Sequence, residues 1–164
     1  MNVTGMFRPG MRAYIIPIGA GLTLAASAFL PWVVVAGVPV QDGPGLAALW
    51  VLGFGAVAVV LATLSLITRK NSRHPLLIIG LAALGITYLS FRIMPRLADE
   101  HAQTVAEAFA IVENRPVGSV PTASAGSGIY VGLGASAVLV AFGLTIVIKR
   151  AARPYVVVDP NDEV

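Results

Sequence analysis

Cysteine is absent from the 164-residue chain, which excludes disulfides, thiolate metal sites and cysteine nucleophiles. Charged side chains are scarce as well, because they make up 12% of the residues, against about 25% in an average soluble domain. Hydrophobic residues make up 57%, and the mean hydropathy is +0.84. In a chain too short for a large buried core, this composition predicts that lipid is the solvent.

Charge is missing from four long stretches, and each can hold the roughly 20 apolar residues that cross a bilayer. The sequence therefore predicts an all-α membrane protein, a bundle of four transmembrane helices within residues 1–150. The expected spans are 13–35, 46–68, 75–94 and 128–148. Pro17 and Pro31 predict a kink or an early end in the first of them.

The start of the chain shares some features with a cleavable signal peptide. Arg8 and Arg12 precede an apolar run, and residues 26–28 (Ala-Ser-Ala) resemble a cleavage site. The apolar run continues past Trp32 to Val40, however. We therefore expect the first span to be retained.

The orientation follows from the lysines and arginines that flank the spans, since cytoplasmic loops carry the excess. Three belong to the side that would be outside, namely Arg92, Arg96 and Arg115. Eight belong to the other side: Arg8, Arg12, Arg69, Lys70, Arg73, Lys149, Arg150 and Arg153. Both termini are therefore predicted to be cytoplasmic. Because these basic residues flank the spans, the net charge of +3 does not indicate nucleic-acid binding.

Two extramembrane segments could dock a partner. In the second outer loop, a short amphipathic helix is predicted over 97–113, and coil after it. The first outer loop, 36–44, is predicted to be a tight turn, and 151–164 to be a cytoplasmic docking tail. The residues expected to contact a partner are Ala98, Ala102, Val105, Phe109 and Val112 in the outer loop, and Tyr155, Val156, Val157 and Val158 in the tail.

The spans carry small residues where a transporter would carry charge. Only Arg92 approaches a span interior, and we interpret it as an interfacial anchor because its long side chain can reach the headgroups. Small residues spaced along helices let backbones approach closely, within one bundle or between copies. The predicted packing residues are Gly128, Gly132, Ser136, Gly53, Gly55, Gly80 and Gly85.

Cofactor and catalytic signals are weak. His74 and His101 could each ligate a pigment or haem, but they are predicted on opposite sides of the membrane. Trp32 could stack on a cofactor, although an interfacial aromatic belt explains it as well. We expect no metal site and no enzyme, because the carboxylates lack a histidine partner or metal-ligand spacing.

Two features have a familiar form: Leu30-Pro31-Trp32 with a glycine-rich turn after it, and Gly128-Ile129-Tyr130 at the start of a glycine-rich last helix. They resemble a loose class of small bacterial membrane proteins with four helices, most of them without an assigned function. The resemblance covers most of the chain, implies a location in the inner membrane of a bacterium, and implies no catalytic residues.

Two functions remain open. The first is a non-catalytic accessory subunit of a larger membrane complex, of the respiratory or photosynthetic electron-transfer kind, whose partners are lipids and other integral membrane subunits. The second is a small transporter or lipid-binding protein that works as a homo-oligomer. It would use hydroxyl groups between the helices, which more often donate back to their own helix.

Overall fold

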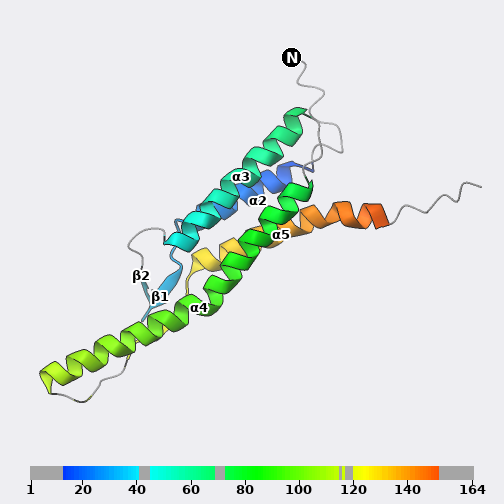
Figure 1. The fold of residues 1–164 in the computed structure, drawn as a ribbon. Helices are drawn as coiled ribbons and strands as arrows, with labels where there is room; N and C mark the ends of the chain where they lie inside the picture. The colour runs from blue at the N-terminus through cyan, green and yellow to red at the C-terminus, as the bar shows by residue number, and fades with distance from the viewer. Residues whose placement is uncertain (1–12, 41–44, 69–72, 115, 117–119, 152–164) are drawn as a thin grey trace, which may run out of the picture.

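The computed structural model describes residues 13–40, 45–68, 73–114, 116 and 120–151. Its helices are α2 (Ile15–Ser27), α3 (Leu46–Thr68), α4 (Arg73–Glu113) and α5 (Ser127–Ala151). They form an up-and-down bundle in which α2 and α4 each pack against both α3 and α5 (Figure 1). The start of α2, the end of α3, the start of α4 and the end of α5 gather at one end, and three short strands lie toward the other.

The first helix is shorter than predicted. It ends at Ser27, whereas the sequence predicts a span over 13–35. This agrees with the early end that Pro31 predicts, because proline has no backbone N–H and disfavours helical geometry in the residue before it. The β-branched run Val33–Val35 then forms strand β1. Of the described helices, α3, α4 and residues Ser127–Thr145 of α5 are long and apolar enough to cross a membrane, whereas α2 has 13 residues.

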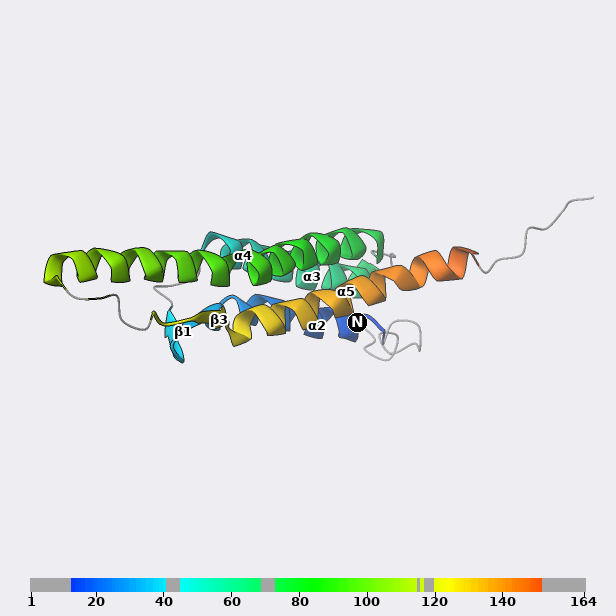
Figure 2. The same ribbon diagram turned by 90° about the horizontal axis from the view of Figure 1, so that it is seen from below.

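Helix α4 is longer than predicted, because the expected span 75–94 and the expected outer-loop helix 97–113 are one continuous helix of 41 residues. Pro95 lies inside it, and α4 bends near this position without breaking (Figure 1). At about 1.5 Å per residue, such a helix is about 60 Å long, roughly twice the hydrocarbon thickness of a bilayer. Figure 2 shows its second half projecting past the ends of the other helices.

The α2–α3 and α4–α5 connections also contain a small antiparallel sheet, which an all-α prediction leaves out. Its strands are β1 (Val33–Val35), β2 (Val38–Val40) and β3 (Ala123–Ala125), in the order β2-β1-β3. The β1–β2 turn is formed by Ala36 and Gly37, both with positive φ (51° and 79°), as in the two-residue turns that suit hairpin twist. Strands β1 and β3 pack against α4, so the sheet joins the α2–α3 and α4–α5 connections beside that helix.

The core of the bundle combines a few large side chains with many small ones. Leu24, Val51, Leu76, Ile129 and Leu139 are fully buried, among alanines such as Ala58, Ala62 and Ala83. Many large apolar side chains instead face outward along the helices. Such exposed apolar surface is unusual for a soluble monomer but is expected for a protein whose helices contact lipid.

Candidate functional site

Trp32 lies at the junction between the bundle and the sheet. Its indole N–H donates to the carbonyl of Ser27 (2.9 Å), which binds one of the carbonyls left open at the end of α2. The carbonyls of Pro31 and Trp32 accept hydrogen bonds from the backbone N–H groups of Gly128 (2.9 Å) and Gly126 (2.8 Å). The side chain is only 5% exposed. Protein contacts therefore occupy the indole that the sequence suggests as a cofactor-stacking group.

The two histidines are far apart on one helix. His74 lies at the start of α4 and His101 in its second half, and both are exposed. They are separated by 27 residues, about 40 Å of helix. One cofactor therefore cannot bind both within a single chain. Among the described residues, no group of three His, Asp or Glu side chains is placed to hold a metal ion.

The glycines proposed for packing divide into two groups. A Cβ atom added to Gly55 would lie 2.6 Å from the Ala25 nitrogen, and one added to Gly80 would lie 3.0 Å from Leu139. Gly128 and Gly132 have neighbours as close, and Ser136 is buried. Gly53 and Gly85, in contrast, face open space. Two further glycines outside the predicted set do pack closely, because a Cβ added to Gly126 would lie 2.7 Å from the Pro31 carbonyl carbon and one added to Gly143 would lie 2.6 Å from the Leu77 Cβ.

Four of the five buried serine and threonine side chains in the described part of the chain donate within their own helix. Ser27, Ser65, Thr87 and Ser136 each donate to a carbonyl three or four residues earlier in the same helix. This pattern satisfies the hydroxyl within its own helix, so these groups do not form a chain of polar contacts between helices. This arrangement therefore gives no support to a transport path lined by these hydroxyls.

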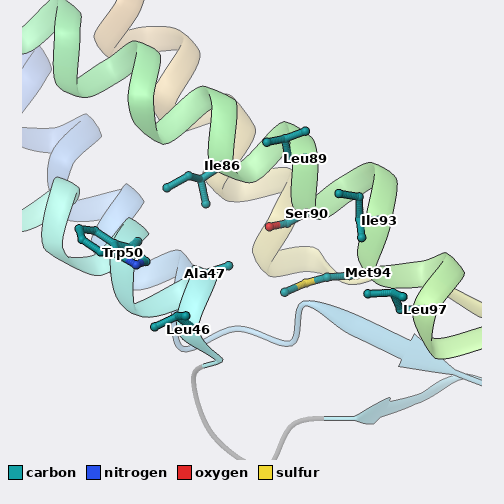
Figure 3. Close-up of a pocket in the computed structure, with 9 residues that line it drawn as sticks. All are labelled: Leu46, Ala47, Trp50, Ile86, Leu89, Ser90, Ile93, Met94 and Leu97. Atoms are coloured by element: carbon teal, nitrogen blue, oxygen red, sulfur yellow. The ribbon is translucent and has the colours of Figure 1, made fainter. Parts of the chain in front are cut away.

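A groove opens on the side of the bundle where α3 begins beside the middle of α4 (Figure 3). Its volume is about 390 Å³, and Ser90 is its one polar lining residue. Trp50 forms part of the α3 wall and is 57% exposed. The lining residues are Leu46, Ala47 and Trp50 from α3, and Ile86, Leu89, Ser90, Ile93, Met94 and Leu97 from α4. Neither the size nor the place of this groove is evident from the sequence.

Beyond the groove, α4 continues as an arm, residues 97–113. Phe109 is 63% exposed and Val112 82% exposed, and Val105 on the same predicted stripe is exposed too. Ala98 and Ala102, also on that stripe, are half-buried. The arm therefore carries an uncovered apolar face, whereas the other predicted docking segment, Tyr155–Val158, lies outside the described residues.

One carboxylate connects the arm to the sheet. Asp99 accepts a hydrogen bond from the backbone N–H of Ala123 at 2.5 Å, so a residue of α4 holds the first residue of β3. The neighbouring carboxylate, Glu100, is exposed. From the sequence, Asp99 is expected in the first turn of a separate helix. In the structure it lies within the continuous helix α4, where its carboxylate binds a strand residue.

Replacing Asp99 with alanine is expected to loosen β3, because the Ala123 N–H loses its charged acceptor. A hydrogen bond to a charged group contributes about 1.5–3 kcal/mol when buried. Partial exposure reduces this to about 1 kcal/mol, or roughly fivefold faster amide exchange at Ala123. Hydrogen–deuterium exchange with peptide resolution measures it, and Glu100→Ala is the matched control. Equal protection of β3 in both variants would contradict the anchoring role.

No protein-family model, curated protein or solved structure matches this chain.

Proposed function

We propose that the protein is a non-catalytic subunit of a larger membrane complex, and that its arm docks on another subunit outside the bilayer. The observation that carries this proposal is the length of α4. Its 41 residues are about twice what a bilayer core requires, so the arm extends beyond the membrane while keeping an apolar face.

The apolar face of the arm supports a protein partner rather than lipid. In Figures 1 and 2 the arm projects away from the far end of the bundle, past the sheet. Phe109 and Val112, which share this face near the tip, are both exposed. An apolar helix face held in water is a recurring element of protein interfaces, where it lies in a complementary groove.

The charges of the arm indicate the chemistry of the partner. Between Leu97 and Asn114 there is no lysine or arginine, whereas Asp99, Glu100, Glu107 and Glu113 are all acidic. Complementary potentials favour association and suppress wrong partners. The partner surface is therefore an apolar groove bordered by lysine or arginine side chains.

The proposed topology has four crossings. Helix α2 packs against α3 and α5, and the segment from Ala28 to Trp32 lengthens it toward the sheet, so together they complete a fourth crossing. The excess of lysine and arginine at the other end of the bundle supports a cytoplasmic location for both termini. The arm then lies outside the cytoplasm, and the complex belongs to the inner membrane of a bacterium.

The test compares Phe109→Glu with Gln103→Glu, two exposed positions on different faces of the arm. The tagged full-length protein is purified from its native membrane in mild detergent, with a photo-crosslinking residue at Val112. We expect a stoichiometric membrane subunit with the unmodified chain and with Gln103→Glu, cross-linked through an apolar segment flanked by Lys or Arg. With Phe109→Glu we expect at least a tenfold lower yield of that subunit, because a buried unpaired carboxylate costs several kcal/mol.

Two results would overturn the proposal. One is a homo-oligomer of this chain without other subunits; the second is a partner that is retained by Phe109→Glu and cross-links elsewhere. The absorption spectrum of the intact particle tests the respiratory or photosynthetic assignment separately. Haem or pigment bands from the partner are expected if that assignment is right.

A further inference from the structure

The groove between α3 and α4 lies where a membrane lipid would meet the protein. It extends from Ile86, within the apolar part of α4, to Leu97, at the start of the arm. Its depth therefore covers the outer end of the apolar segment and the boundary with water. Trp50 in its wall is partly exposed, as tryptophans are at the level of lipid headgroups.

A polar row runs beside the apolar row of the groove on α4. Residues four apart in a helix are neighbours on one face. Leu89, Ile93 and Leu97 form the apolar row, and Arg92, Arg96 and Glu100 form the row beside it, about 60–100° around the helix. All three polar residues are exposed. Along this row toward the arm, the order is cation, cation and carboxylate.

This order matches one class of lipid. We propose that the groove binds a zwitterionic phospholipid with an ammonium headgroup, of the phosphatidylethanolamine kind. One acyl chain lies in the apolar groove against Ile86 and Trp50. The phosphate of the lipid contacts the Arg96 guanidinium. The ammonium group of the lipid, which is farther from the acyl chains, contacts the Glu100 carboxylate one helical turn farther out. An anionic lipid would use Arg96 but would be repelled by Glu100.

The groove also requires an apolar occupant. Its lining is apolar except for Ser90, so it offers water few of the two to four polar partners that an ordered water needs. An acyl chain restores the van der Waals contacts that an empty groove lacks. The proposed site does not use Phe109 or Val112, so it is independent of docking through the arm.

The chain has two tryptophans, which gives a direct readout. Trp50 lines the groove, and Trp32 is buried at the junction. The full-length protein is placed in bilayers containing increasing fractions of a phospholipid with brominated acyl chains, which quench tryptophan on contact. We expect saturable quenching by the ethanolamine lipid at lower mole fractions than by brominated phosphatidylglycerol or phosphatidylcholine. Trp50→Phe, which retains only Trp32, is expected to lose most of this quenching.

Charge variants test the headgroup contacts. Arg96→Gln and Glu100→Gln are each expected to weaken the apparent affinity for the ethanolamine lipid by about two- to fivefold, the range of an exposed ion pair. Glu107→Gln, two turns farther along the arm, is the control and is expected to change nothing. Thermal unfolding of each variant verifies that the fold is retained, and Phe109→Glu is expected to leave the quenching unchanged.

Three results would overturn the proposal. Equal quenching by all three lipids would indicate ordinary solvation by the bilayer. Preference for phosphatidylglycerol, unaffected by Glu100→Gln, would assign the site to an anionic lipid. Absence of Trp50 quenching would show that protein fills the groove.

Discussion

Replacing Gly126 with alanine is expected to open the junction between the sheet and the bundle. An added Cβ would overlap the carbonyl oxygen of Pro31 and lie 3.0 Å from the Trp32 carbonyl carbon. Both neighbours are backbone, so a side-chain rotation cannot relieve the contact. The N–H of Gly126 also donates to the Trp32 carbonyl at 2.8 Å, and this bond would be lost as the strands separate. Overpacking and a lost hydrogen bond together predict a destabilisation of at least about 2 kcal/mol.

Trp32 itself reports the change. In a Trp50→Phe background it is the remaining tryptophan, and its indole is buried and bonded to Ser27. Gly126→Ala is expected to shift its emission to longer wavelength and to lower the thermal midpoint in detergent. Gly134→Ala is the matched control, because a Cβ there meets no atom within 4 Å. If the two variants have the same emission and midpoint, the close approach at the junction is wrong.

The helices that the sequence predicts best are the ones whose ends are marked by charge or turn residues. Residues 46–68 are predicted as a span, and α3 is Leu46–Thr68. This segment has no proline and no charge, and Arg69 follows it directly. The apolar run and the polar residue after it therefore give the same bounds for α3. The start of α5 at Ser127 is likewise within one residue of the predicted start at 128.

The errors occur at prolines. The span predicted over 13–35 is too long, although Pro31 itself predicts an early end. Helix α4 continues through Pro95, where the prediction ends one helix and begins another. The residues that follow the two prolines differ, because the β-branched run Val33–Val35 follows Pro31 and good helix formers follow Pro95. At Pro31 the tertiary contacts favour extended chain, because β1 pairs with β2 and β3. At Pro95 the bent helix keeps α4 beside the sheet, where Asp99 holds Ala123.

Helical spacing finds the packing residues only in part, because it does not determine which side of a helix faces a neighbour. Gly53 and Gly55 are two residues apart on α3, and only Gly55 contacts another helix. Gly126 lies outside any helical pattern, so its contact with Pro31 depends on a pairing of distant segments. The groove has the same origin, since it exists only where α3 begins beside α4.

The pair Gly53 and Gly55 also gives a sharp test of the bundle. Gly55→Leu is expected to separate α2 from α3, because a Cβ there would lie 2.6 Å from the Ala25 nitrogen and 2.7 Å from the Gly21 carbonyl oxygen. In a membrane, helices associate through close packing rather than through a hydrophobic force between them. Loss of this backbone contact is expected to cost about 3 kcal/mol, at the upper end of overpacking.

Gly53→Leu changes the same residue type in the same helix, but on a side where a Cβ meets nothing within 4 Å. A leucine there faces outward and is expected to leave stability within about 0.5 kcal/mol. Thermal unfolding in detergent, followed by the loss of monodisperse protein, should therefore show a midpoint lower by roughly 5–10 °C for Gly55→Leu alone. If Gly53→Leu were the more damaging variant, that side of α3 would have to be covered by another chain. Its partners would then bind the bundle inside the membrane as well as the arm outside it.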